Sequence, residues 1–211
     1  MRFIDIENWK RKEHYNYFKK MDYPHFNICA NIDITKFYKY IKENELPFFI
    51  SILYASSKAA NSIKEFKLRI REDKVIEHEI VNPSFTVMTD DKIFSFCKSN
   101  YIDNFNEFKV NTLKEIENVK NNIIIKDEVI GDDVVYITSI PWISFTNLTH
   151  PINIDDTASI PRIAWGKYFK DGENIKLPVS VQVHHALLDG VHIGQYFNII
   201  EEIIDNPAKY L

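Results

Sequence analysis

The sequence contains few of the residues that build linkers or disulfide frameworks. Only 5 of its 211 residues are glycine, 8 are proline and 2 are cysteine. Because no Gly-, Ser- or Pro-rich stretch divides the chain, we expect one domain over residues 1–211. Cys29 and Cys97 lie far apart without a CxxC spacing, so we expect buried free thiols rather than a disulfide or a zinc ribbon.

Long apolar runs and blocks of like charge are also missing. The longest apolar run, residues 47–55, is interrupted by Ser51 and is far shorter than the roughly 20 residues that span a bilayer. The formal net charge is −4, with no cluster of Lys or Arg that could bind a phosphate backbone. Residues 1–7 mix acidic and apolar side chains, unlike a secretory signal. We therefore expect a cytoplasmic protein with no membrane span and no nucleic-acid partner.

The residues that are present predict a folded α/β protein. Hydrophobic residues make up 45% of the chain and charged residues 27%, a balance typical of globular domains. Because predicted strands and helices alternate along the chain, we expect an α/β sandwich with a mixed sheet. Periodicity predicts helices over 7–20, 34–43, 46–63, 104–121 and 189–205, and strands over 25–33, 84–88, 93–97, 134–139, 142–145, 160–169 and 175–185.

Turn signals join some of these strands. The tetrad 89–92 separates two alternating segments and predicts a hairpin, as does the Asp-Gly pair within 170–173. Pro141 cannot donate to a strand ladder, so we expect a bend or a sheet edge between 134–139 and 142–145.

One segment combines a strand pattern with residues that can do chemistry. The alternate valines of 179–183 share parity with His185, so an extended strand would point this imidazole into the protein. His184 would face the other way, in a structural or solvent-facing position. Asp189 and Gly190 end the strand, and Asp189 is expected to cap the helix that follows.

Taken alone, these residues allow simpler interpretations. A histidine beside valines is commonly a hydrogen-bonded core residue, and an aspartate before a helix is commonly only a cap. A metal site is a further alternative, because His185, Asp189 and His192 would share a face if the segment were one helix. The valine alternation and Gly190 favour the strand over that helix.

A family resemblance favours the catalytic interpretation. The sequence His184–His192, HHALLDGVH, resembles the HHxxxDGxH signature of the chloramphenicol acetyltransferases, and the chain length is similar to theirs. The wider HxxxDG pattern also occurs in lipoamide acyltransferases and peptide-synthetase condensation domains, whose additional modules are absent here. Further segments that carry the resemblance are 8–14, 32–35, 82–87, 140–145, 166–168 and 177–183.

The resemblance implies a fold, an activity and an assembly. The fold is the two-layer sandwich of CoA-dependent acyltransferases, with a mixed, largely antiparallel sheet covered by helices. The activity is the transfer of an acetyl group from acetyl-CoA to chloramphenicol, an antibiotic-resistance reaction that uses no metal. The family is homotrimeric, with active sites at the subunit interfaces. Two alternatives remain: the same fold acting on a different small alcohol, and a non-catalytic CoA-binding relative.

The resemblance also assigns residues to the reaction. His185 corresponds to the catalytic base, which takes the proton from the substrate hydroxyl as its oxygen attacks the thioester, without an acyl-enzyme. A free imidazole has a pKa of about 6.5 and is therefore largely neutral at cellular pH. Asp189 corresponds to a carboxylate that pairs with Arg11 and holds the loop of the base. Thr138 stands where the family has the serine that stabilises the oxyanion, and it retains a hydroxyl donor.

The same resemblance places the substrates. Lys167 and Tyr168 correspond to residues that contact the phosphate and the adenine of CoA, although an exposed Lys-Tyr pair on a strand is an equally simple interpretation. Phe18 stands in place of a pocket tyrosine, and Phe26 corresponds to a pocket phenylalanine. Ala164 replaces a threonine that holds a water in the active site. These changes leave acetyl transfer intact in principle and leave the acceptor alcohol open.

Overall fold

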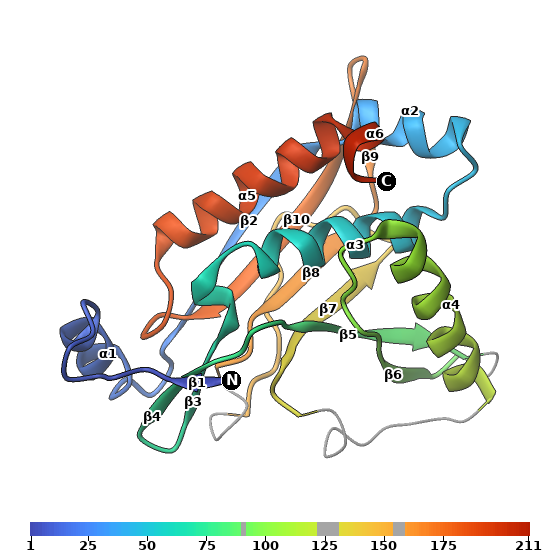
Figure 1. The fold of residues 1–211 in the computed structure, drawn as a ribbon. Helices are drawn as coiled ribbons and strands as arrows, with labels where there is room; N and C mark the ends of the chain where they lie inside the picture. Colours follow the sequence, from blue (N-terminus) through green and yellow to red (C-terminus); the bar gives the residue numbers. More distant parts are fainter. Residues whose placement is uncertain (90–91, 122–130, 154–158) are drawn as a thin grey trace.

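The computed structural model describes residues 1–89, 92–121, 131–153 and 159–211 (Figure 1). Strands and helices follow one another along the whole chain, as the sequence predicts. In order they are β1 (Arg2–Phe3), α1 (Lys12–Phe18), β2 (His25–Asp33), α2 (Thr35–Glu43), α3 (Phe48–Asn61), the 3-10 helix η1 (Lys64–Lys67), β3 (Leu68–Arg71), β4 (Lys74–Glu77), β5 (Asn82–Met88), β6 (Phe94–Lys98), α4 (Phe105–Asn121), β7 (Val134–Ile140), β8 (Arg162–Gly166), β9 (Phe169–Asp171), β10 (Asn174–His184), α5 (Gly190–Asp205) and α6 (Pro207–Tyr210).

A mixed sheet forms one layer of the molecule. Over the described residues it has seven strands in the order β2-β10-β8-β7-β5-β6, with β9 paired to β10. Strand β7 runs parallel to both β5 and β8, and the other neighbouring pairs are antiparallel. The sheet is therefore mixed and largely antiparallel, which confirms the predicted fold class.

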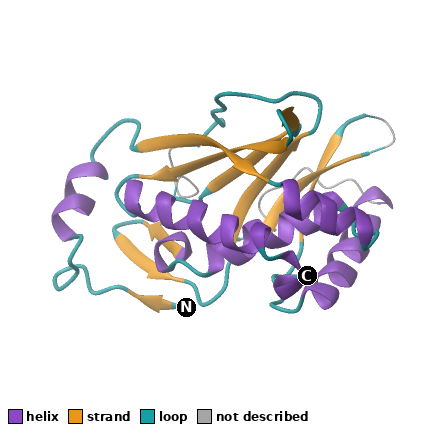
Figure 2. Cartoon of the chain, turned by 90° about the horizontal axis from the view of Figure 1, so that it is seen from above, coloured by secondary structure: helices purple, strands orange, loops and turns teal. Residues whose placement is uncertain are grey.

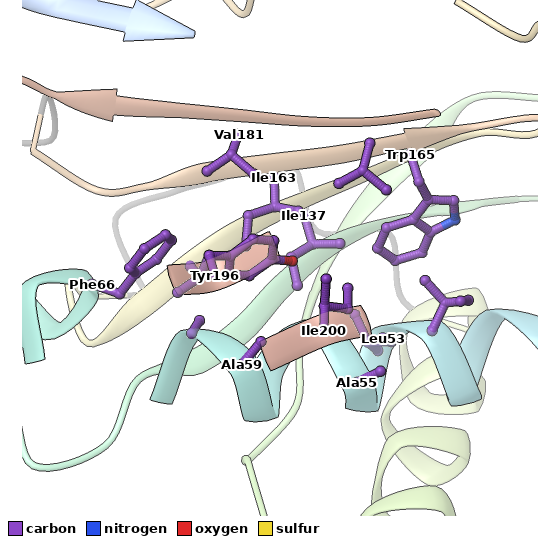
Figure 3. Packing of buried hydrophobic residues seen from close by; sticks show 14 of the residues in the cluster. Leu53, Ala55, Ala59, Phe66, Ile137, Ile163, Trp165, Val181, Tyr196 and Ile200 are labelled. Carbon is purple, nitrogen blue, oxygen red and sulfur yellow. The ribbon is translucent and has the colours of Figure 1, made fainter. Parts of the chain in front are cut away.

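Helices form the second layer. Figures 1 and 2 show α3 and α5 lying together across one face of the sheet. The residues that meet between the layers come from alternate strand positions, as expected for a sheet with one face buried. Figure 3 shows Ile137, Ile163 and Val181 of the strands facing Leu53 of α3 and Ile200 of α5. All five side chains are buried, so this contact is a large part of the hydrophobic core.

The opposite face of the sheet is polar and carries the loop that follows β7. Asn27 Nδ2 donates to the Leu148 carbonyl at 2.9 Å, and Ser180 Oγ donates to Asn27 Oδ1 at 2.8 Å. Further along β10, Gln182 Oε1 accepts from the backbone N–H of His150 at 2.9 Å. These bonds fix residues 147–150 against the sheet, in the region where we describe a pocket below.

Several sequence predictions are confirmed at residue level. Strand 25–33 is observed with the predicted bounds, and α2, α3, α4 and α5 each lie within one or two residues of the prediction. Both predicted hairpins are present, as β5 with β6 and as β9 with β10. Residues 90–91 of the first turn lie outside the described residues.

Other predictions are wrong in instructive ways. Residues 142–145 form no strand, because the chain leaves the sheet after Pro141 and exposes Trp142 and Ile143. The predicted strand 160–169 is divided into β8 and β9, and the first helix is shorter than predicted. A small sheet in the order β1-β4-β3 was not predicted at all.

Gly166 lets the loop after β7 approach the end of β8. A Cβ at this position would lie 2.7 Å from the Ile143 carbonyl oxygen and 2.9 Å from Pro178 Cγ. We expect Gly166→Ala to lower the free energy of unfolding by about 1–3 kcal/mol, because the backbone must shift to accommodate the methyl group. Urea unfolding of the purified protein measures this change.

The matched control is Gly194→Ala, in the exposed middle of α5. A Cβ there meets nothing within 4 Å. Alanine is the better helix former by roughly 0.5–1 kcal/mol, so this variant should be as stable as the wild type or more stable. Equal effects of the two substitutions would contradict the packing argument.

Candidate active site

His185 lies in the turn that connects β10 to α5. Strand β10 ends at His184, one residue earlier than predicted, and the His185 N–H donates to the Pro24 carbonyl at 2.7 Å. Two further bonds close the turn, from the backbone N–H groups of Leu187 and Leu188 to the His184 carbonyl. The backbone of His185 is therefore held on both sides.

The imidazole of His185 is oriented by two aromatic rings and one carbonyl. Phe18 stacks on it with ring centroids 3.9 Å apart and an interplanar angle of 9°, and Phe26 lies at 4.5 Å in a tilted arrangement. Nδ1 is 3.1 Å from the Leu188 carbonyl oxygen. Because a carbonyl can only accept, Nδ1 must carry the proton in this bond, which leaves Nε2 with a free lone pair.

Arg11 and Asp189 form an ion pair beside this turn. Arg11 Nη1 lies 2.5 Å from Asp189 Oδ2, and Arg11 Nη2 donates to the His185 carbonyl at 3.3 Å. Asp189 also caps α5 by accepting from the Val191 N–H at 3.2 Å. Arg11 precedes α1 and Phe18 ends it, so this one short helix contacts the turn from both of its ends (Figure 1).

The charge of Asp189 persists well below neutral pH. Partial burial acts to raise its pKa, but the hydrogen bond from Arg11 and the charges of His192 and Arg11 outweigh burial and hold the pKa below 3.8. A lowered carboxylate pKa stabilises the fold at neutral pH, and this stabilisation is lost only as the pH falls through the folded-state value. The ion pair is thus intact throughout the pH range in which an imidazole titrates.

Replacing Arg11 tests what the ion pair contributes. Arg11→Ala should lower the free energy of unfolding by about 1–3 kcal/mol, below the range for a fully buried pair because a third of the Asp189 side chain is exposed. It should also lower kcat, since the His185 carbonyl loses a donor. Urea unfolding and steady-state kinetics measure both effects. Lys10→Ala, an exposed neighbour, is the control, and an equal loss there would contradict the role of the pair.

The two neighbouring histidines are engaged in the structure. His184 is buried, contrary to a solvent-facing position, and burial together with the charges of His25 and His185 lowers its pKa to about 3. His192 Nδ1 accepts from the Asp189 N–H at 3.0 Å, completing the cap of α5. Over the described residues, no group of three His, Cys, Asp or Glu side chains is arranged to hold a metal ion.

Thr138 lies on β7 and lines a pocket of about 240 Å³ on the polar face of the sheet. It pairs with Ala164 of β8, which in turn pairs with Ser180 of β10. The remaining described residues of the pocket come from β5, β6, β7, β8 and the loop after β7. They are Ser84, Phe85, Thr86, Phe96, Tyr136, Ile137, His150, Pro151, Asn153 and Arg162.

Thr138 and His185 of one chain lie far apart. In the sheet register Thr138 of β7 is level with Ser180 of β10, which lies two strands away. Ser180 precedes His185 by five residues. At about 3.3 Å per residue and about 4.8 Å per strand, their backbones are separated by roughly 15–20 Å. The two residues therefore cannot contact the same reacting group within one chain.

Lys167 and Tyr168 lie beyond the end of β8, on the side of Thr138 that is remote from His185. Lys167 is exposed, and its backbone N–H donates to the Ile143 carbonyl at 2.8 Å. Tyr168 packs in an aromatic cluster, with its hydroxyl 3.3 Å from that of Tyr38 and its ring centroid 5.5 Å from that of Phe48. The exposed ring offers a flat apolar surface next to a cation.

Comparison with known proteins places this geometry in a family. The sequence model of the family "Chloramphenicol acetyltransferase" matches residues 1–201. The chain is 34% identical to a chloramphenicol acetyltransferase of Clostridium perfringens, with 99% of this chain and 96% of the relative aligned. It is 30% identical to a chloramphenicol acetyltransferase of Bacillus pumilus over 97% of this chain and 94% of the relative.

Solved structures have the same fold. A chloramphenicol acetyltransferase superposes with a TM-score of 0.82 at 22% identity, covering 96% of this chain and 99% of that one. The cubic core of a pyruvate dehydrogenase complex superposes with a TM-score of 0.73 at 15% identity, covering 93% and 87%. Fold and family together define an acyltransferase. The chain belongs to the chloramphenicol acetyltransferase family.

The sequence predicted only part of what lies around Thr138. Among the lining residues to which it assigned no role are Tyr136, His150 and Arg162, and also Ser84, which lies in the resemblance segment 82–87. Tyr136, His150 and Arg162 lie outside every motif that the sequence offered. Only the sheet register brings them together.

Over the described residues, no helix has the length and apolar character required to cross a bilayer.

Proposed function

We propose that the protein transfers the acetyl group of acetyl-CoA directly to a hydroxyl of chloramphenicol, with His185 as general base. The observation that carries the proposal is the bond between His185 Nδ1 and the Leu188 carbonyl, which leaves Nε2 free to accept a proton. The names of the relatives support chloramphenicol as the acceptor. The cytoplasm is the proposed location, because acetyl-CoA is available there.

The reaction needs one proton acceptor and one oxyanion donor. Nε2 of His185 takes the hydroxyl proton as the substrate oxygen bonds to the carbonyl carbon of the thioester. The Thr138 hydroxyl donates to the oxygen that becomes negative in the tetrahedral intermediate. When the intermediate collapses, the carbon–sulfur bond breaks and the proton returns from the imidazolium to the CoA sulfur. The products are the acetyl ester and CoA thiol.

We infer that the complete site lies between two subunits. The separation of roughly 15–20 Å along and across the sheet prevents Thr138 and His185 of one chain from sharing an intermediate. A second copy would supply His185 to the pocket beside Thr138. The family resemblance favours a homotrimer, in which each of three equivalent interfaces holds one site. Each chain contributes to that assembly as one domain.

Lys167 and Tyr168 are proposed to bind CoA, the Lys167 ammonium at a phosphate and the Tyr168 ring at the adenine. Tyr168→Ala should raise KM for acetyl-CoA about 5- to 150-fold with little change in kcat, because base stacking is worth about 1–3 kcal/mol. Steady-state kinetics with varied acetyl-CoA measure this. Phe3→Ala removes a ring that is 63% exposed on β1 and serves as the control. A change in kcat alone would contradict the assignment.

Release of CoA thiol tests the proposal as a whole. Wild-type protein with acetyl-CoA should release thiol when chloramphenicol is added and not in its absence. A second candidate is the same reaction with a different small alcohol, favoured by Ala164, which pairs with Thr138, and by Phe18 in place of a pocket tyrosine. Thiol release with other alcohols but none with chloramphenicol would select it. Binding of CoA without turnover of any alcohol would favour a non-catalytic relative.

A further inference from the structure

The pocket beside Thr138 contains two polar atoms that acetyl transfer itself does not require. Ser84 Oγ and His150 Nε2 are both buried, and neither has a hydrogen-bond partner among the described residues. A buried polar atom without a partner destabilises the fold, so few are retained in folded proteins. Two in one pocket therefore suggest that a ligand completes their hydrogen bonds.

Both side chains are held where they line the pocket. Ser84 is 2% exposed and lies on β5, with its backbone paired to Tyr136 and to Lys98 in the sheet. The backbone N–H of His150 donates to Gln182 Oε1 at 2.9 Å, which fixes the loop that carries the ring. Neither position depends on a bound ligand, so the hydrogen-bonding groups are preorganised.

The imidazole of His150 is neutral at physiological pH. Burial, with a smaller contribution from the charge of Arg162, lowers its pKa to about 4. A neutral imidazole nitrogen can donate or accept according to its tautomer, and a serine hydroxyl can do both. The pair therefore suits a group with both a donor and an acceptor, such as an amide or a hydroxyl.

The rest of the pocket suits an aromatic body. The rings of Phe96 and Tyr136 contribute to its walls, together with Ile137 and Pro151. Rings of this kind pack well against a planar apolar group. A volume of about 240 Å³ accommodates a small molecule rather than a peptide.

We propose that Ser84 and His150 determine acceptor specificity by binding a second polar group, an amide or hydroxyl, on an aromatic alcohol whose reacting hydroxyl lies near Thr138. This inference rests on the proposed function, since it assumes that the pocket receives the acceptor. It adds a requirement that neither the base nor the oxyanion donor imposes. An alcohol of the same shape without the second polar group leaves both buried atoms unpaired and is discriminated against.

The test compares two acceptors of similar shape, 4-(hydroxymethyl)benzamide and 4-methylbenzyl alcohol, by thiol release from acetyl-CoA. The wild type should favour the amide by about tenfold or more in kcat/KM, since 1.4 kcal/mol corresponds to a factor of ten. In Ser84→Ala and His150→Leu the preference should fall below about threefold, mainly through a raised KM for the amide. His150→Gln retains hydrogen-bonding groups and should recover part of the preference.

Thermal unfolding separates this role from a structural one. Ser84→Ala removes a buried hydroxyl that has no partner, so its Tm should equal or exceed that of the wild type even as selectivity falls. Ser57→Ala is the matched control, a buried serine on α3 that donates to the Leu53 carbonyl at 2.7 Å. His14→Leu, at an exposed histidine, is the control for His150→Leu. Neither control should change the preference.

The outcomes distinguish the specificity role of Ser84 and His150 from the proposed acetyl transfer on which it rests. Thiol release with both alcohols in the same ratio for wild type, Ser84→Ala and His150→Leu would overturn the specificity role and leave the proposed function standing. Absence of thiol release with these alcohols and with chloramphenicol would overturn both. A lowered Tm with unchanged selectivity would show Ser84 to be structural only and would overturn its part in the proposal.

Discussion

His185→Ala is expected to lower kcat for acetyl transfer by about 10²- to 10⁴-fold, the range that a positioned general base contributes. The loss should appear in kcat more than in KM for acetyl-CoA, because Lys167 and Tyr168, the proposed CoA contacts, lie at the other end of the sheet. The fold should persist, since the half-buried ring packs against Phe18 and Phe26 at the edge of the core. Steady-state thiol release and thermal unfolding measure the two expectations.

The control for this variant is another histidine of the same chain. His14→Ala removes an exposed imidazole from α1, the helix that also contacts the base through Phe18. Its activity should be close to that of the wild type. Residual activity of His185→Ala above a tenth of the wild-type value would contradict general-base catalysis by this residue.

Mixed oligomers give the second large effect. Thr138→Val keeps the shape of the side chain and removes its hydroxyl, and loss of an oxyanion donor lowers kcat by about 10²- to 10³-fold. Each of Thr138→Val and His185→Ala should therefore be nearly inactive alone. If every site combines Thr138 of one subunit with His185 of another, random co-assembly at equal amounts makes about a quarter of the sites intact. Co-expression with two affinity tags isolates the mixed oligomers, and in a mixed trimer one of the three sites is intact.

Mixed oligomers recover activity only if Thr138 and His185 of one site come from different subunits. A site built within one chain would contain at least one substitution in every mixed oligomer, and activity would stay at the mean of the two variants. Oligomers of wild type with His185→Ala provide the reference for the assembly itself, because half of their sites should be intact. Activity of the double mixture no higher than that of the separate variants would contradict the intersubunit site.

Local sequence patterns predicted the elements whose packing is simple. Strand β2 alternates over its whole length, and α5 begins at an aspartate cap, so both were found with accurate bounds. Residues 142–145 have a strand-like composition, but Pro141 and the approach of Ile143 to Gly166 direct the chain out of the sheet. That approach is a tertiary contact, which no local pattern encodes.

The residues of the candidate site also differ in how far local sequence patterns indicate them. His185 and Asp189 lie within five residues of each other, so the local pattern drew attention to them, and the family resemblance then gave them their roles. Arg11 has no local signal and was identified only through the family resemblance, yet it lies 2.5 Å from Asp189. Ser84 lies in the segment 82–87 that carries the family resemblance but received no role from it, and His150 belongs to no motif. Only the sheet register and the return of the loop reveal that they line one pocket.

The bond that orients His185 spans only three residues, from Nδ1 to the carbonyl of Leu188. Phe18, Phe26 and the contact of Arg11 with its backbone restrain the ring further within one chain. One chain therefore contains groups that set the tautomer and the ring angle of this imidazole. In the proposed intersubunit site, a general base that is oriented by its own chain would lower the entropy cost of bringing the acceptor hydroxyl and the imidazole together.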